Sequence, residues 1–160
     1  DLTYCLIDIP PVLYLATEYL RSIFPDRVID YDQASKMNRI TEEDIRGKIL
    51  IIPPWLIDRL EMKFDLFWNS ASFQEMEKSV VVEYLDRISN ICQCVGLKSL
   101  VKGHALGAGG QLEPISLDWL SDEVIERKYS EIPVKDQSAA SHVNNILNPL
   151  YKIRVFKKDN

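Results

Sequence analysis

Short apolar runs alternate along the chain with segments of helical periodicity, and no other feature constrains the fold as strongly. The apolar runs predict strands within residues 2–8, 27–31, 48–60, 64–68 and 97–107. Helices should connect them, the first opening at Pro11 and the longest ending at a left-handed cap on Gly96. Because each crossover helix must lie on a sheet face, this order predicts an α/β, three-layer sandwich around a mostly parallel sheet.

Two of the predicted helices carry apolar stripes that should face the core. The stripes comprise Val12, Leu15, Ala16, Tyr19, Leu20 and Ile23 in the first helix, and Val81, Tyr84, Leu85, Ile88, Ile91, Cys92 and Val95 in the second. Residues 32–39 form a polar connection to Thr41, whose hydroxyl can cap a short turn. Toward the C-terminus we expect a helix over 117–127 and two strands, 129–135 and 150–158, joined by a polar loop.

Length, composition and charge limit the classes of protein to which the chain can belong. With 160 residues, 46% of them hydrophobic, the chain can bury one sizeable core, so we expect a single domain over residues 1–160. The net charge of −5, with both signs interspersed, argues against a nucleic-acid partner. No apolar run reaches the roughly 18 residues of a membrane span. Because the chain opens at Asp1 inside a predicted strand, we expect it to be the C-terminal portion of a longer domain.

The three cysteines favour a reduced, cytoplasmic protein. Cys92 and Cys94 lie two apart within a helical pattern, where their side chains would diverge too far to pair or to share a metal ion. Cys5 leaves the number odd. No spacing of His, Asp or Glu predicts a divalent metal site, although scattered carboxylates could still hold one.

Ligands of open α/β sheets bind outside the carboxyl ends of the strands. This rule selects Asp8, the loop 53–55, the segment 69–75 and the loop 103–110 as the candidate site. The segment 69–75 is the most informative, because an apolar strand there turns polar within a few residues. Strand 64–68 is expected to be buried on both faces and to leave the sheet at Asn69.

Three stretches carry a resemblance to a known family. The stretches IDIPPVLYLATEYLRSIFP, ILIIPPWLIDRL and DLFWNSASFQEM, the last followed by a VVEYLDRI helix, resemble the sugar O-methyltransferases, a branch of the class I S-adenosylmethionine-dependent methyltransferases. The match covers residues 2–105. It implies a seven-stranded sheet, with six strands parallel and the last antiparallel, and S-adenosylmethionine bound at the strand tips. The two C-terminal strands would then form a closing, hairpin-like pair.

The chain departs from this family at one unit. Family members begin with a strand and a glycine-rich turn that grips the cofactor, and this unit would precede the strand ending at Asp8. The glycine cluster at 103–110 follows the fifth strand and lacks the strand–GxGxxG–helix context of a cofactor loop. The missing strand would lie between the first and fourth strands of this chain. Either a longer protein supplies it, or the chain rearranges or associates, for example as a homo-oligomer.

The resemblance assigns cofactor-binding roles to four residues. Asp8, with Ile9 beside it, would accept hydrogen bonds from both ribose hydroxyls, although an acid there also suits NAD or the start of a helix. Trp55 would stack on adenine, or alternatively pack under its short helix. Asn69 would line the pocket near the sulfonium.

The remaining candidates would serve the acceptor. Ser70, Ser72 and Gln74 would bind a sugar or sugar nucleotide, and either Glu75 or His104 would take the hydroxyl proton. The alternative for Ser72 and Glu75 is a capping box ahead of the helix. His142 is a weaker candidate in the polar C-terminal loop. Basic residues crowd the C-terminal third, which suits either an exposed edge strand or an anionic sugar.

The sequence therefore predicts methyl transfer from S-adenosylmethionine to a carbohydrate hydroxyl. Two rival functions stay open. An NAD-dependent enzyme of related fold would need an upstream glycine fingerprint and an acid or base facing the nicotinamide. A non-catalytic interaction module would result if the chain binds no cofactor without the glycine-rich unit.

Overall fold

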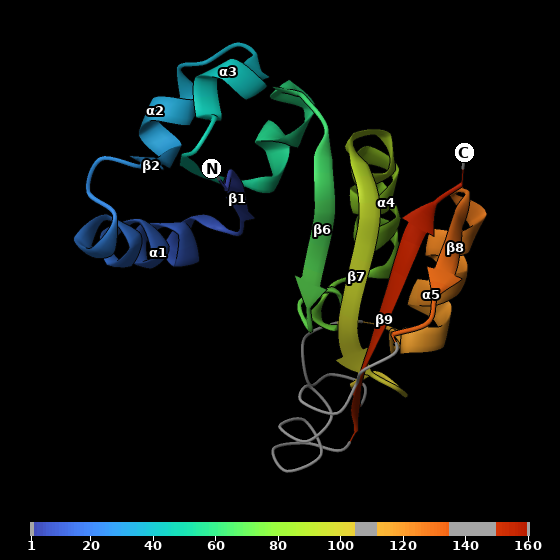
Figure 1. The fold of residues 1–160 in the computed structure, drawn as a ribbon. Coiled ribbons are helices and arrows are strands. Elements are labelled where there is room, and N and C mark those ends of the chain that lie inside the picture. Colours follow the sequence, from blue (N-terminus) through green and yellow to red (C-terminus); the bar gives the residue numbers. More distant parts are fainter. Residues whose placement is uncertain (1, 105–111, 135–149, 160) are drawn as a thin grey trace. The chain divides into compact units, whose positions relative to one another are not determined.

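The computed structural model describes residues 2–104, 112–134 and 150–159 (Figure 1). The chain divides into two compact units, residues 1–63 and 64–160. Each unit combines parallel strand pairs with helices, so the mixed α/β class predicted from the alternation of strands and helices is confirmed. The single domain over residues 1–160 stays a prediction. No helix in the described part of the chain is long and apolar enough to cross a membrane.

The N-terminal unit contains a three-stranded parallel sheet. Its order is β1 (Tyr4–Ile7), β4 (Ile49–Ile52), β2 (Val28–Ile29), with Ile7 paired to Ile52 at the carboxyl ends. The helix α1 (Pro10–Ile23) follows β1 directly, since two prolines suit its first turn. Smaller elements complete the unit: α2 (Tyr31–Ser35), β3 (Ile40–Thr41), α3 (Glu42–Ile45), the 3-10 helix η1 (Pro54–Arg59) and β5 (Leu60–Glu61).

Helix α1 buries a different face from the predicted one. Leu13 and Thr17 are its buried residues, and Leu13 packs with Val28 and Ile51. Four members of the predicted stripe are exposed instead: Val12, Leu15, Tyr19 and Ile23. The prediction for these four was wrong because α1 is apolar around much of its circumference. Periodicity alone does not show which side meets the sheet.

The first half of the polar stretch 32–39 belongs to helix α2 (Tyr31–Ser35) rather than to a connection. Asp30 caps α2 through a reciprocal pair of hydrogen bonds: the Gln33 backbone N–H donates to Asp30 Oδ1 (2.8 Å), and the Asp30 N–H donates to Gln33 Oε1 (3.1 Å). Strand β2 consequently ends at Ile29, and Tyr31 opens the helix. The Thr41 hydroxyl and N–H both donate to the Asp44 carboxylate at the start of α3, and these bonds hold the Asp44 pKa below its ordinary value.

The C-terminal unit contains a four-stranded mixed sheet. Its order is β6 (Phe64–Ser70), β7 (Cys92–Leu100), β9 (Tyr151–Lys158), β8 (Tyr129–Ile132). Strands β6 and β7 are parallel, whereas β9 runs antiparallel to both of its neighbours. The last strand is therefore antiparallel, as predicted. Because β9 is paired on both sides, its basic residues do not protect an exposed edge, and that interpretation was wrong.

Two helices cover one face of this sheet, α4 (Lys78–Ile91) and α5 (Leu117–Glu126) (Figure 1). The predicted α4 stripe is confirmed for its central members Val81, Leu85 and Ile88, which are buried. The core between helices and sheet also contains Phe73, Val95, Leu97, Ile115, Leu120, Val124 and Phe156. Phe73 joins this core to the short 3-10 helix η2 (Phe73–Glu75), which contains the last three residues of the candidate segment 69–75.

The longest helix does not end at Gly96, contrary to the prediction. Helix α4 ends at Ile91, and β7 begins with Cys92, so Gly96 lies in the middle of a strand. Glycine leaves room there for the Trp68 ring: a Cβ on Gly96 would lie 2.4 Å from Trp68 Cε3, so the ring would have to shift. Cys94 likewise lies in the strand, where side chains two apart share a face rather than diverge. None of the three cysteines, all within the described residues, forms a disulfide.

Strand β6 differs from its prediction in length and burial. It extends two residues beyond 68, and Ser70 still pairs with Lys98 of β7. It is not buried on both faces, since the Leu66 and Trp68 side chains are about half exposed, at 51% and 46%. The helices cover one side only, which leaves these two apolar residues on the other.

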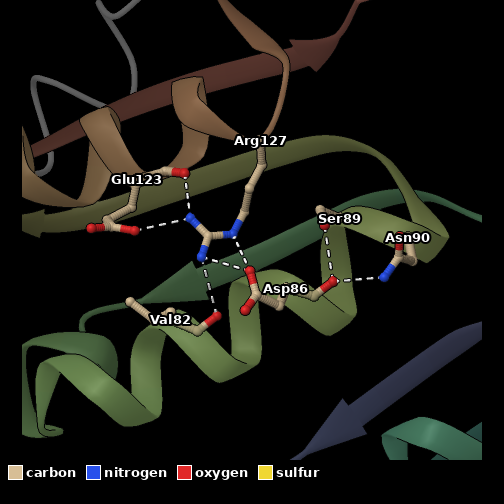
Figure 2. Close-up of polar contacts among 6 residues, drawn as sticks. All are labelled: Val82, Asp86, Ser89, Asn90, Glu123 and Arg127. Atoms are coloured by element: carbon tan, nitrogen blue, oxygen red, sulfur yellow. Dashed lines mark hydrogen bonds and ion pairs between the residues drawn. The ribbon is translucent and has the colours of Figure 1, made fainter.

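An ion-pair cluster joins α4 to the end of α5. Figure 2 shows the Arg127 guanidinium between Asp86 of α4 and Glu123 of α5. Its Nε lies 2.7 Å from Asp86 Oδ1, and its NH1 group donates to the Glu123 carbonyl (2.7 Å) and carboxylate (2.9 Å). NH2 also donates to the Val82 carbonyl at 3.4 Å. Burial lowers the pKa of Arg127, but the bonds and charges of Glu123 and Asp86 outweigh it and raise the pKa above its ordinary value.

Candidate functional site

The chain leaves β6 through a tight turn built on Asn69. The Asn69 side chain is buried and bonds within the turn: Nδ2 donates to Ser72 Oγ (2.6 Å), and Oδ1 accepts from the Phe73 N–H (3.3 Å). Ala71 adopts a left-handed conformation (φ 70°), and its N–H donates to the Lys98 carbonyl at 2.8 Å. The turn therefore fixes the path from the end of the sheet into η2.

The capping-box alternative for Ser72 and Glu75 is wrong. The Ser72 side chain makes no capping bond to η2, and its hydroxyl accepts from Asn69 instead. Helix α4 begins three residues after Glu75, at Lys78, with Glu77 as its N-cap. The Phe73 N–H at the start of η2 goes to the Asn69 side chain, and the Glu75 N–H, which a capping serine side chain would have received, goes to the Ser72 carbonyl at 3.1 Å.

Gln74 is the centre of a buried hydrogen-bond network. Its amide Oε1 accepts from the Ser99 hydroxyl and from the Leu100 backbone N–H, both at 3.0 Å. Its Nε2 donates to the Tyr151 hydroxyl at 3.0 Å and lies 2.8 Å from His104 Nε2. Gln74 itself is fully buried. All four hydrogen-bonding positions of the amide are thus occupied.

His104 reaches this network through a sharp bend after β7. Gly103 has a φ of 75°, and a Cβ on it would lie 2.5 Å from the backbone oxygen of Ile115. Only glycine fits such a position. The bend brings His104 Nε2 to within 4.0 Å of Glu75 Oε1, while the Glu75 side chain stays largely exposed. Glu75 and His104, the two residues predicted to take the proton, therefore lie side by side although they are 29 residues apart in the chain.

Ser70 lies at the last position of β6 and is exposed. Parallel β6 and β7 have their carboxyl ends at the same edge, where Ser70 ends β6 and pairs with Lys98 of β7. The substrate-binding roles of Ser70, Ser72 and Gln74 stay predictions. The Gln74 amide, with every position occupied by protein groups, is arranged to hold its neighbours in place.

The N-terminal unit carries the other candidates at the carboxyl ends of β1 and β4. Asp8 follows β1, and its Oδ1 accepts from the Ile9 N–H at 2.8 Å. Ile9 is the N-cap residue of α1 and is exposed. Trp55 lies in η1 just after β4 and is 55% exposed. Since β1 and β4 are adjacent and parallel, Asp8 and Trp55 follow neighbouring strand ends.

Each unit brings together its own candidates. The hypothesis that Asp8 and the segment 69–75 surround one shared pocket stays a prediction. His142 and residues 105–110 of the glycine cluster lie outside the described residues. Among the residues described, no group of three or more His, Cys, Asp or Glu side chains is placed to hold a metal ion.

Sequence reasoning missed Ser99 and Tyr151, the two side chains that complete the Gln74 network. Ser99 had a detectable signal: it lies two residues after core-facing Leu97, so strand alternation places a polar group toward the buried side. Tyr151 had none, because its position depends on β9 pairing with β7 through the whole register from Cys94 to Leu100.

No protein-family model and no curated protein matches the chain. The function must therefore be argued from its own residues.

Proposed function

We propose that the chain transfers a methyl group from S-adenosylmethionine to a hydroxyl of a sugar or sugar nucleotide. The observation that carries the proposal is the adjacency of Glu75 and His104 at the carboxyl ends of two parallel strands. A sugar hydroxyl is a weak acid, so its methylation needs a group that takes the proton as the new bond forms. A carboxylate next to an imidazole at this edge of the sheet supplies such a group.

The antiparallel last strand gives additional support. The resemblance to sugar O-methyltransferases implies a mostly parallel sheet closed by one antiparallel strand. Strand β9 runs antiparallel between β7 and β8. An NAD-dependent enzyme, the first rival, has no specific observation in its favour.

The residues of the N-terminal unit fit an adenosyl group. The Asp8 carboxylate accepts from the Ile9 N–H at Oδ1, and carboxylate oxygens have further lone pairs that can accept from ribose hydroxyls. Exposed Trp55 offers an indole face on which adenine can stack. When bound, S-adenosylmethionine would supply an electrophilic methyl group. The part of this chain is to align that methyl group with the acceptor oxygen and to receive the hydroxyl proton.

Calorimetric titration of the chain with S-adenosylmethionine, and separately with NAD, tests the donor. Binding of S-adenosylmethionine alone supports the proposal. Binding of NAD alone supports the dehydrogenase, and binding of neither supports an interaction module. Asp8→Asn should weaken S-adenosylmethionine binding about 10- to 100-fold, because hydrogen bonds to a charged acceptor contribute roughly 1.5–3 kcal/mol each.

Transfer of a labelled methyl group to a panel of monosaccharides and sugar nucleotides tests the acceptor. Glu75→Gln should lower kcat about 10²- to 10⁴-fold, the usual contribution of a general base, and leave S-adenosylmethionine affinity unchanged. Glu77→Gln is the matched control, since Glu77 is a nearby carboxylate whose Oε1 accepts from the Leu112 N–H at 2.8 Å. Equal activity of the Glu75→Gln variant and the wild type would exclude Glu75 as the base.

A further inference from the structure

The orientation of the Gln74 amide is fixed by an unambiguous donor. The Leu100 backbone N–H can only donate, so the amide atom 3.0 Å away must be the carbonyl oxygen Oε1. The Ser99 hydroxyl approaches the same oxygen at 3.0 Å. The opposite atom, Nε2, is consequently an NH2 group that can only donate.

The orientation of the Gln74 amide determines which ring nitrogen of His104 carries the proton. Gln74 Nε2 lies 2.8 Å from His104 Nε2, and a hydrogen bond between them forms only if the imidazole nitrogen accepts. A neutral imidazole that accepts at Nε2 carries its proton on Nδ1. The second N–H of the same amide goes to the Tyr151 hydroxyl. An inverted amide would face the Leu100 N–H with its own NH2 group, so Gln74 cannot turn its oxygen toward His104 without losing the Leu100 bond.

We propose that Gln74 is a positioning residue that holds His104 as the Nδ1–H tautomer, so that the imidazole serves the site as a hydrogen-bond donor and not as its base. The basic nitrogen of His104 is engaged by the buried amide. Glu75, whose carboxylate is exposed 4.0 Å from that nitrogen, is then the group that receives the acceptor's proton. The role of Glu75 rests on the proposed function, whereas the tautomer of His104 does not.

Nitrogen NMR of the full chain with ¹⁵N-labelled histidine tests the tautomer directly, because protonated and unprotonated ring nitrogens have well-separated chemical shifts. The spectrum is recorded at about pH 8.5, where imidazoles are neutral, and His142→Gln assigns the signals of His104. We expect the proton on Nδ1 of His104. A proton on Nε2 in the wild-type protein would overturn the proposal without any variant.

Gln74→Glu provides the matched change. Its carboxylate still accepts from Ser99 and Leu100, but its second oxygen can only accept, so the proton of His104 should move to Nε2. Tyr151→Phe removes the other partner of the Gln74 NH2 group and should leave the proton on Nδ1. An unchanged tautomer in Gln74→Glu, or a changed one in Tyr151→Phe, would contradict the proposal.

The methyl-transfer assay separates this inference from the proposed function. His104→Asn retains an N–H donor and removes the basic nitrogen, so its kcat should fall far less than that of Glu75→Gln. A loss in His104→Asn equal to that of Glu75→Gln would contradict the donor role. An Nδ1–H tautomer in a protein that binds no S-adenosylmethionine would instead refute the proposed function alone.

Discussion

Replacing Arg127 tests whether one guanidinium holds α4 and α5 together. Arg127→Met keeps much of the side-chain stem and removes the contacts of the guanidinium with Asp86, Glu123 and Val82 (Figure 2). The Arg127 and Glu123 side chains are only 14% and 18% exposed, whereas Asp86 is 62% exposed. The substitution therefore strands the Glu123 carboxylate in a mostly buried position and removes donors from the carbonyls of Val82 and Glu123.

The size of the effect follows from these contacts. A hydrogen bond to a charged group contributes about 1.5–3 kcal/mol, while an exposed ion pair contributes about 0–1 kcal/mol. Losing the buried Glu123 contact and the weaker carbonyl contacts should lower the free energy of unfolding by about 2–4 kcal/mol. With a urea m-value of about 2 kcal/mol/M, the midpoint should fall by about 1–2 M.

Urea denaturation followed by circular dichroism measures this midpoint. Asp86→Asn is the matched control, because it removes only the exposed partner and should cost about 0.5 kcal/mol. If Arg127→Met shifts the midpoint no more than Asp86→Asn does, the buried part of the cluster does not stabilise the unit. The reasoning from burial would then be refuted.

Two further predictions concern the same unit. Gly96→Ala should cost about 1–3 kcal/mol of stability, since its Cβ would lie 2.4 and 2.7 Å from Trp68 Cε3 and Cζ3. In a Trp68→Ala background the cost should fall below about 0.5 kcal/mol. Equal costs in both backgrounds would exclude the Trp68 ring as the cause. Burial, together with the nearby thiols of Cys92 and Cys94, raises the pKa of Tyr129 to about 12, so its phenol stays neutral in the folded protein while the unfolded chain ionises near pH 10. The stabilisation that depends on the neutral phenol is fully present below pH 10 and is lost as the pH rises to 12. Across that window, the difference in free energy of unfolding between the wild type and Tyr129→Phe, followed by thermal melts, should shrink by about 2–3 kcal/mol. A constant difference would contradict the raised pKa.

Much of the fold could be predicted from local pattern. The apolar runs placed β1 and β4, two prolines placed the start of α1, and the stripe centred on Leu85 placed α4. These features depend on residues within one or two turns of each other, so periodicity and backbone preference suffice to find them. The same reasoning found Glu75 and His104 at strand ends, because the carboxyl ends of parallel strands meet at one edge.

The predictions were wrong where contacts with residues distant in the sequence determine the local structure. Gly96 looks like a helix cap in the sequence, but it lies in a strand that pairs with Trp68, 28 residues earlier, on one side and with Val155 on the other. The exposed side of α1 is as apolar as a core stripe, and only its packing on Val28 and Ile51 shows that Leu13 is the buried residue.

For the candidate site, too, some features follow from the sequence and others only from the tertiary structure. The sequence by itself determined which polar and ionisable groups follow the strand ends, since residue type and strand boundaries are local properties. Only the tertiary structure decided that Gln74 is buried and saturated by Ser99, Leu100 and Tyr151, and that its NH2 group meets His104. The reason is that hydrogen-bond partners 25 to 77 residues away are brought to one amide by the pairing of β6, β7 and β9.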